Sequence, residues 1–278
     1  AMERLTGAAK KLNHTFPKWS DQLQTPPELI AHTPAKADAV YFATCITRTL
    51  GDGEGGKPSL LRTFIEVAER AGVSLFLPTS IGGYCCSQIF SSKGYTQAQE
   101  YMANYVVEAL YQWTEGGKLP VVLDVSSCTQ SIRGIRPVLS PRNQRYFDSL
   151  TIYDSIEFVA EYLLPRLDIR HKKHRVALHP VCSLYKMGTV EVLEKVAQAC
   201  ALHTFTPEHA GCCGMAGDRG FVVPGLTVAA TAREVAELHA VSCDGYYATS
   251  RPCELSLGET SGLPFESILY LLEEVTRP

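Results

Sequence analysis

Residues 175–182 read Arg-Val-Ala-Leu-His-Pro-Val-Cys, a short apolar run that leads directly to a cysteine. A continuous apolar run of this length is typical of a strand that is buried on both faces of a sheet. A similar run, Ala-Val-Tyr-Phe-Ala at residues 39–43, leads in the same way to Cys45. Both halves of the chain therefore contain a predicted buried strand that places a cysteine at its carboxyl end.

Eight of the ten cysteines repeat one arrangement twice: a single cysteine, an adjacent pair, and a further single cysteine. The two sets are Cys45, Cys85, Cys86 and Cys128, and then Cys182, Cys212, Cys213 and Cys253. A duplication of this kind indicates an internal structural repeat. The two remaining cysteines fall outside the pattern. Cys200 shares an apolar helix face with Leu193, and we expect both Cys200 and Cys243 to serve in packing.

Predicted strands alternate with predicted amphipathic helices in both halves. The strands are expected at 39–43, 73–77, 120–125, 175–178, 202–205 and 245–249, and the helices around 61–68, 98–113, 193–200 and 228–238. The last helix is expected to bury Val228, Thr231, Ala232, Val235 and Leu238. This order predicts an α/β fold of two pseudo-repeated, Rossmann-like halves with parallel sheets, packed face to face. We place the halves at 38–150 and 151–278, after a connector at 1–37.

The cysteines of each set are expected to converge, because each follows a predicted strand and the carboxyl ends of parallel strands share one edge. Open α/β sheets bind ligands at that edge. Four thiolates suit a soft metal centre, either an iron–sulfur cluster or zinc. Adjacent cysteines on one turn are poorly placed for two corners of a tetrahedral zinc site, which favours the cluster and leaves zinc open.

Several residues beside the cysteines are further candidates. Gly214 allows the backbone to approach an inorganic group closely, and Asp218 is expected to cap a helix. His179 is expected to be a hydrogen-bond donor to a cluster, a ligand, or a packed residue at a strand end. Three arginines are expected to offset thiolate charge, bind an anionic donor, or form surface salt bridges. They are Arg48, Arg219 and Arg251.

The charge balance and hydropathy exclude two classes of function. The chain has 26 basic and 29 acidic residues and a formal net charge of −3. A nucleic-acid-binding domain would carry a basic excess, so no nucleic-acid partner is expected. The apolar runs are much shorter than the ~18–20 residues that a transmembrane helix requires. We therefore expect no transmembrane segment.

The cysteine arrangement resembles the cysteine-rich CCG domain of heterodisulfide reductases and of the iron–sulfur parts of glycolate and lactate oxidation systems. Four segments are most similar to the C-terminal region of FAD-linked D-lactate dehydrogenases. They are Cys45-Ile-Thr-Arg-Thr-Leu-Gly51, His179-Pro-Val-Cys182, Gly211-Cys-Cys-Gly-Met-Ala-Gly-Asp-Arg-Gly220 and Ser250-Arg-Pro-Cys-Glu254. The resemblance implies an oxidoreductase fragment or subunit whose eight motif cysteines hold one or two iron–sulfur clusters of the 4Fe-4S type.

The same resemblance implies FAD on an upstream domain or partner subunit, and electron transfer from a 2-hydroxy acid to a quinone or cytochrome. It also implies a cytoplasmic location, with peripheral association at the inner face of the membrane. Two alternatives stay open: a heterodisulfide-reductase-like thiol/disulfide site, and a zinc-stabilised docking module. The sequence departs from the family pattern at three places. Ser87 replaces the glycine after the first pair, and Val125 and Ser250 replace the first residue of each terminal Cys-x-x-Cys. The cluster type and number therefore stay open.

Overall fold

The structure, a computed structural model, describes residues 2–14, 16–17, 20, 23, 28–29, 31–51 and 57–278. The described residues form two four-stranded sheets in which every pairing is parallel. The strand order is β2-β1-β3-β4 in the first sheet and β6-β5-β7-β8 in the second. The same order in both sheets confirms the predicted fold of two repeated, parallel α/β halves.

The strands of the first sheet are β1 (Ala39–Phe42), β2 (Leu75–Phe76), β3 (Val121–Leu123) and β4 (Ile152–Asp154). Those of the second are β5 (Lys173–Leu178), β6 (Ala201–Phe205), β7 (Gly245–Ala248) and β8 (Phe265–Ser267). Every residue of β1 and β3 is buried, as a parallel sheet covered on both faces requires. The sequence did not indicate β4 or β8. Because β4 pairs with β3, the first sheet extends past residue 150.

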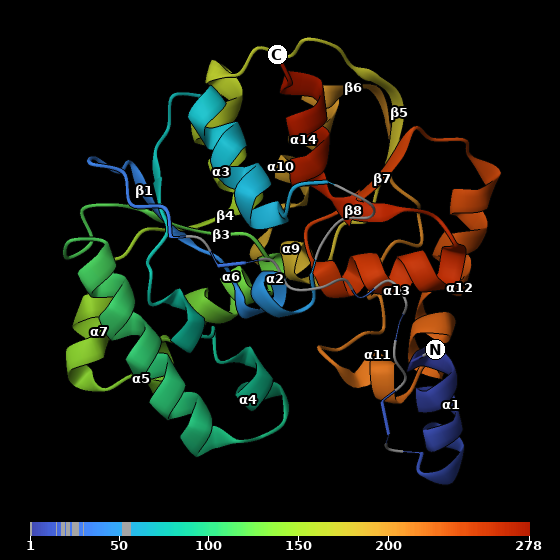
Figure 1. The fold of residues 1–278 in the computed structure, drawn as a ribbon, viewed down its shortest axis with the longest axis horizontal. Helices are drawn as coiled ribbons and strands as arrows, with labels where there is room; N and C mark the ends of the chain where they lie inside the picture. Colours follow the sequence, from blue (N-terminus) through green and yellow to red (C-terminus); the bar gives the residue numbers. More distant parts are fainter. Residues whose placement is uncertain are drawn as a thin grey trace.

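The helices cover both sheets and fill the space between them (Figure 1). In the first half they are α2 (Cys45–Thr49), α3 (Leu60–Arg70), α4 (Gln88–Ser92), α5 (Thr96–Trp113), α6 (Ser126–Arg133), α7 (Pro141–Asp148) and α8 (Ser155–Phe158). In the second half they are α9 (Cys182–Met187), α10 (Val190–Cys200), α11 (Arg219–Val222), α12 (Gly225–Ala240), α13 (Arg251–Ser261) and α14 (Ile268–Thr276). Short 3-10 segments lie at Ile81–Gly83, Arg136–Val138 and Leu164–Arg166, and a π-helical turn at Val159–Leu163.

The two halves pack against each other with approximate two-fold symmetry. Helix α3, which follows the first strand of its sheet, packs against α14, which follows the last strand of the other. The equivalent pair, α10 and α8, packs in the same way. One continuous apolar core includes residues from both halves. In Figure 1, α2, α6 and α9 lie between the two sheets. The peptide N–H of Ser126, after β3, donates to the carbonyl of Thr249, after β7, so the carboxyl edges of the sheets face each other.

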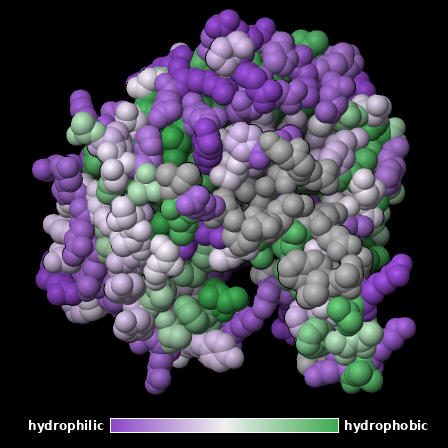
Figure 2. Space-filling model, viewed as in Figure 1, coloured by the Kyte–Doolittle hydropathy of each residue, from purple (hydrophilic) through white to green (hydrophobic). Residues whose placement is uncertain are grey.

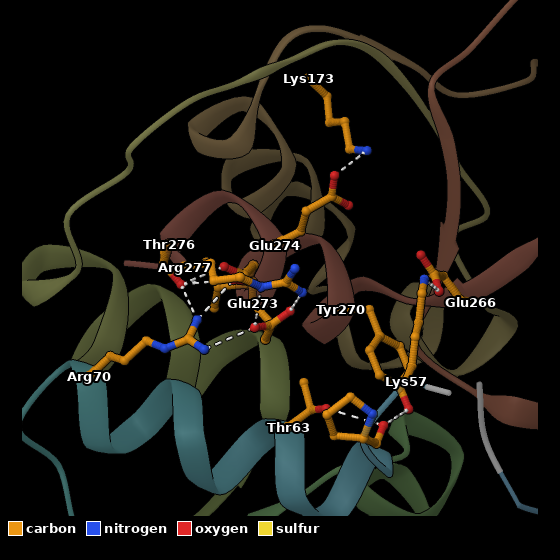
Figure 3. Close-up of polar contacts among 12 residues, drawn as sticks. Lys57, Thr63, Arg70, Lys173, Glu266, Tyr270, Glu273, Glu274, Thr276 and Arg277 are labelled. Carbon is orange, nitrogen blue, oxygen red and sulfur yellow. Dashed lines mark hydrogen bonds and ion pairs between the residues drawn. The ribbon is translucent and has the colours of Figure 1, made fainter. Parts of the chain in front are cut away.

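Polar contacts reinforce the α3–α14 interface (Figure 3). Arg70 of α3 donates to the carboxylate and to the backbone carbonyl of Glu273, both at 2.9 Å. The hydroxyl of Tyr270 donates to the carbonyl of Pro58 at 3.0 Å, and Lys57 pairs with Glu266 at 2.5 Å. These contacts join residues about 200 positions apart and fix the relative orientation of the halves.

The predicted connector contains one helix that the sequence did not indicate, α1 (Met2–Leu12). Lys10 of α1 donates to the carbonyl of Val222 in the second half. Further along, His32 and Leu77 exchange backbone hydrogen bonds and form an isolated antiparallel bridge. The rest of the connector falls largely on residues 18–19, 21–22, 24–27 and 30, which lie outside the described residues. None of the described helices combines the length and the apolar character needed to cross a bilayer.

Candidate functional site

The four single cysteines of the repeat lie in the first turn of a helix that directly follows a strand. Cys45 begins α2 after β1, and Cys182 begins α9 after β5. Cys128 lies in the first turn of α6 after β3, and Cys253 in that of α13 after β7. Backbone N–H groups at a helix start lack intrahelical partners, so this position favours a thiolate.

The adjacent pairs lie in the loops that follow β2 and β6, the strands next to β1 and β5. The backbone turns sharply after each pair. Ser87 has φ +66° after Cys86, and Gly214 has φ +74° after Cys213. The left-handed conformation that the family pattern assigns to glycine is thus kept in the first half by a serine. Sequence comparison with the family marked this position as a departure, yet the backbone conformation is the same.

The first site comprises Cys45, Cys85, Cys86 and Cys128. The Sγ atoms of Cys45 and Cys85 lie 3.7 Å apart. Cys86 shares hydrogen bonds with Cys128 and with Cys85, and a charge on Cys128 acts on Cys45. All four sulfurs therefore belong to one group, as their placement after parallel strands predicts.

The second site comprises Cys182, Cys212, Cys213 and Cys253, and it repeats this geometry. Cys182 is hydrogen-bonded to Cys212, and the Sγ atoms of Cys213 and Cys253 lie 2.8 Å apart. Electrostatic interactions join Cys182 to Cys213 and to Cys253. The structure thus brings together each set of four cysteines that the sequence singles out.

Each site is built from two sulfur couples that differ in burial. The inner couples, Cys86–Cys128 and Cys213–Cys253, are 2–6% exposed. The outer couples are Cys45–Cys85, which is partly exposed, and Cys182–Cys212, which is exposed. Each site therefore has one edge anchored in the core and one edge near solvent, and the second site is the more open.

In each outer couple, the hydrogen bond between the two cysteines favours the thiolate form of one of them. The hydrogen bond from Cys45 lowers the pKa of Cys85 to about 3, and the backbone N–H of Ser87 acts in the same direction. In the second site the bond from Cys182 lowers the pKa of Cys212 to about 5, helped by the N–H of Gly214. The pKa values of Cys45 and Cys182 rise correspondingly, because each shares its proton with the thiolate beside it.

The inner couple of the second site behaves in the same way. The hydrogen bond from Cys253 lowers the pKa of Cys213, and the backbone N–H of Met215 also lowers it. The pKa of Cys253 rises well above its usual value through that bond and through burial. Thiolates are the form in which cysteines bind metals, so each site holds donors in the state that ligation requires.

Two cations act on the outer couples. Arg48 is 8% exposed and donates to the carbonyls of Ala43, Gly82 and Tyr84, which joins the loop after β1 to the loop before Cys85. It also lowers the pKa values of Cys45 and Cys85. Lys186 of α9 has the same effect on Cys182 and Cys212. The sequence indicated Arg48 but missed Lys186, which lies one helical turn after Cys182.

The other two arginines lie in different environments. Arg251 is 8% exposed, and its Nε donates to the carbonyl of Gly51 at 2.9 Å. Arg219 is exposed on α11. The preceding Asp218 occupies the N-cap position, but its side chain makes no cap hydrogen bond, so the predicted cap is wrong. Asp218 instead pairs with Lys93, which directly follows α4, at 2.7 Å. Figure 2 shows the surface hollowed between α4 and α11, and this ion pair joins the residues next to these two helices.

His179 lies at the end of β5 and is completely buried. Its Nδ1 is 2.7 Å from Oε1 of Glu234, which projects from α12 and is 1% exposed. The sequence indicated His179 but not its partner. The predicted apolar face of α12 is wrong in part, because Val228 and Ala232 are exposed and Glu234 is buried. The helix is rotated so that the carboxylate meets the imidazole.

Several buried polar atoms without a hydrogen-bond partner belong to residues close in sequence to the motif cysteines. In the described part of the chain, four buried side-chain atoms lack a partner: Ser87 Oγ, His179 Nε2, Ser183 Oγ and Thr189 Oγ1. Ser87 and Ser183 each follow a motif cysteine directly. Unsatisfied buried groups are costly and call for an explanation. A group seated among the sulfurs fits both this arrangement and the thiolate donors.

The sulfurs lie closer together than they would around an inorganic core, so binding one would require the couples to separate. Within the described ranges, no group of three or more His, Cys, Asp or Glu side chains is arranged to hold a single metal ion. The cysteines of a cluster bind different irons and need not surround one point. The donor chemistry therefore fits a cluster once the outer couples open.

Comparison with known proteins identifies the family of this chain. The pattern that defines the cysteine-rich domain, CCG, matches residues 39–133 and 176–258. The chain belongs to the cysteine-rich CCG domain family. The two matches coincide with the two α/β halves, and each contains one complete cysteine site.

The curated relatives are components of a dehydrogenase. The chain is 26% identical over 233 residues to one of the subunits of the anaerobic glycerol-3-phosphate dehydrogenase, from two strains of Escherichia coli. The match covers 79% of this chain and 55% of each relative, so the CCG chain spans about half the length of the relatives it matches. Among solved structures, an aspartate racemase homologue from Pyrococcus horikoshii aligns with 85% of this chain and 96% of its own, at 7% identity and a TM-score of 0.29.

Proposed function

We propose that this CCG chain is the iron–sulfur electron-transfer module of a flavin-linked dehydrogenase. One observation carries the proposal: four cysteines from three strand ends meet at one sheet edge, and the same arrangement occurs twice. Buried inner couples would anchor a 4Fe-4S group, and outer couples near solvent would let a partner exchange electrons with it. The chemistry would belong to the group, whereas the chain supplies ligands, burial and hydrogen bonds.

The residues of this chain have defined tasks in that proposal. The backbone N–H groups of Ser87, Gly214 and Met215 hold negative charge on the sulfurs. Arg48 and Lys186 offset part of the charge of the outer couples. Hydrogen bonds and positive charge near cluster sulfurs raise the reduction potential. The chain would thereby tune its two sites to accept electrons.

We further propose that the donor is a flavoprotein, on an upstream domain or partner subunit, that oxidises a 2-hydroxy acid such as D-lactate. The acceptor would be a quinone or a cytochrome. Similarity of the segments around Cys45, Cys182 and Cys253 to D-lactate dehydrogenases supports the 2-hydroxy acid. The curated relatives carry the name of a glycerol-3-phosphate dehydrogenase, which supports the dehydrogenase class and offers a competing substrate.

The electron-transfer proposal is tested by chemical analysis of protein purified without oxygen. We expect iron and acid-labile sulfide in matching amounts, and a broad visible absorbance that bleaches on reduction. Zinc without sulfide would instead favour a zinc-stabilised docking module. Protein that contains neither iron nor sulfide after anaerobic reconstitution would refute the proposal.

The substrate is tested in membranes from cells that lack this chain. We expect such membranes to lose D-lactate-dependent quinone reduction and to regain it with the wild-type chain but not with Cys213→Ser. Loss of glycerol-3-phosphate-dependent reduction alone would reject the 2-hydroxy acid while retaining electron transfer. Both substrates are assayed on the same membranes, so that a general loss of quinone reduction is recognised.

A second candidate function is thiol–disulfide exchange. Cys212 is exposed, its pKa is lowered to about 5, and Cys182 lies beside it as a second thiol. A thiolate of this kind attacks disulfides readily. Reduction of one equivalent of a disulfide substrate by the iron-free protein, with oxidation of Cys182 and Cys212 to a disulfide, would favour this candidate over electron relay if Cys212→Ser abolishes it.

A further inference from the structure

The pair formed by His179 and Glu234 is the most deeply buried ion-pairing contact of the second half. Their side chains are 0% and 2% exposed, and Nδ1 lies 2.7 Å from Oε1. The peptide N–H of His179 donates to the carbonyl of Tyr247 on β7 at 2.9 Å, which fixes the backbone from which the ring projects. Burying a polar pair costs desolvation free energy, and apolar side chains would fill the same space without that cost. The presence of the pair therefore calls for an explanation.

The other ring nitrogen of His179 has no partner. Nε2 is buried and makes no hydrogen bond to any described residue. A neutral imidazole whose Nδ1 faces a carboxylate keeps its proton on that nitrogen, which leaves a free electron pair on Nε2. Metal-ligating histidines share this arrangement, because a carboxylate or carbonyl accepts the proton of the nitrogen that does not bind the metal.

The imidazole lies beside the second site. It comes three residues before Cys182, at the carboxyl end of the strand that leads to that cysteine. Its partner Glu234 lies on α12, which follows the loop with Cys212 and Cys213 in the chain. The imidazole is therefore held at the sheet edge that carries the second site.

The first half has a different pair at the equivalent place. Phe42 ends β1 three residues before Cys45, as His179 follows β5 three residues before Cys182. Its ring packs 6.5 Å from that of Trp113 on α5, the helix that corresponds to α12. In the first half, an aromatic contact thus replaces the histidine and carboxylate of the second half. The second site therefore has a potential nitrogen ligand that the first site lacks.

From this contrast we propose that His179 Nε2 is a fifth protein ligand of the second site, with Glu234 as the residue that positions it. This inference rests on the proposed iron–sulfur function. The neutral ring gives its electron pair to one iron, and the Nδ1 proton stays on the bond to Glu234, so no proton is released. The first site, with Phe42 at this position, is ligated by cysteines alone.

The difference in ligands between the two sites sets the direction of electron transfer. Replacing thiolate ligation with histidine raises the potential of iron–sulfur centres. The second site is thereby the better electron acceptor of the two, and electrons pass from the first site to the second. The second site is also the more exposed, which suits it to deliver electrons to an external acceptor.

The test is pulsed EPR spectroscopy of the whole chain, reconstituted with iron and sulfide without oxygen and then reduced. A background variant, Cys85→Ser with Cys128→Ser, removes the first-site signal. We expect a strong nitrogen hyperfine coupling, shifted by ¹⁵N-histidine labelling, that His179→Gln abolishes. Phe42→Leu, placed in the wild-type chain, is the matched control and leaves the coupling unchanged. Glu234→Gln is expected to keep the coupling but raise the potential of the second site, because it removes a negative charge and a strong hydrogen-bond acceptor from the imidazole.

Two results would overturn the ligand assignment while leaving electron transfer intact. One is an iron–sulfur signal with no nitrogen coupling, and the other is a weak coupling typical of a hydrogen bond that persists unchanged in His179→Gln. Absence of any cluster in the wild-type chain would instead reject the proposed function itself. If His179→Gln fails to fold, His179→Cys is used, for which we expect a folded protein, a retained cluster and loss of the nitrogen coupling.

Discussion

Nε of Arg251 donates a 2.9 Å hydrogen bond to the carbonyl oxygen of Gly51, 200 residues away in the sequence. Arg251 begins α13, which carries Cys253, and Gly51 follows α2, which begins at Cys45. The bond therefore joins the helix that presents one site to the helix that presents the other. A second bond joins the two halves just before α13, where Ser126 Oγ of α6 donates to Thr249 Oγ1 at 2.7 Å.

Arg251→Ala is expected to destabilise the whole chain. The change removes a buried charged donor and leaves the carbonyl of Gly51 and the carboxylate of Glu254 with fewer partners. Such a loss costs about 3 kcal/mol of unfolding free energy. Urea unfolding of the metal-free protein measures it. Arg62→Ala, which removes an exposed pair with Glu66, is the control and should cost less than about 0.5 kcal/mol. Equal effects of the two changes would show that Arg251 does not join the halves.

Cys213→Ser is expected to remove one iron–sulfur centre, because Cys213 belongs to the inner couple of the second site and its hydrogen bond with Cys253 lowers its pKa. Cys200→Ser is the matched control. Cys200 is fully buried in the apolar core on α10 and belongs to neither group of four sulfurs, so we expect it to serve in packing. Iron and sulfide analysis of both variants decides the matter. Equal loss of iron from the two would contradict the separation of ligands from packing cysteines.

The sequence predicted the parallel α/β halves because six strands are short apolar runs and each motif cysteine follows one of them. It could not predict β4 and β8. Each has three residues, and the Ile-Tyr-Asp of β4 contains no apolar run. These strands exist because β3 and β7 offer an unpaired edge, which is a property of the folded sheet.

The cysteines of the sites followed from spacing, whereas their polar neighbours did not. Helical periodicity assigned Val228 to the core. In the structure α12 turns Glu234 inward to meet His179, and Val228 lies on the surface. Lys186 and Glu234 act on the second site from helices whose orientation depends on tertiary packing. Local sequence contains no signal for either. That the cysteines hold a metal stays a prediction.

Asp154 should give the protein a pH-dependent stability. It is completely buried, and that burial raises its pKa to about 6 although Thr129 donates a hydrogen bond to it. In the unfolded chain its pKa is about 3.9. The folded state therefore binds the proton more tightly, so the stabilisation is complete below about pH 4 and is lost as the pH rises through 6.

Asp154→Asn removes this titration. The stability of the wild type relative to the variant should fall by about 3 kcal/mol between pH 4 and pH 7. If the amide side chain of the variant fails to make one of the hydrogen bonds of the carboxyl group, the variant loses the same unfolding free energy at every pH. The pH dependence of the difference between the two proteins is then unchanged. Thermal unfolding of both proteins across this range provides the measurement. Parallel curves would mean that Asp154 titrates normally.

Ser87→Gly is expected to stabilise the first half. Ser87 adopts φ +66°, which costs a residue with a Cβ about 1 kcal/mol, and its buried hydroxyl has no partner. Glycine relieves both penalties and loses some of this gain to the greater freedom of the unfolded chain. We expect a net gain of about 1 kcal/mol in urea unfolding. A loss of stability would indicate that the hydroxyl binds a group in the folded protein.

The reciprocal change, Gly214→Ala, should be far more harmful. The new Cβ would lie 2.6 Å from the carbonyl oxygen of Leu226, at a residue with φ +74°. Backbone at the start of α12 would have to move, at a cost of about 3 kcal/mol, and Cys213 would move with it. Gly217→Ala is the matched control in the same loop. Its φ is +76° but its Cβ meets no atom within 4 Å, so only the strain of about 1 kcal/mol remains. If both variants lose the same stability and retain the same iron, close packing at Gly214 does not shape the second site.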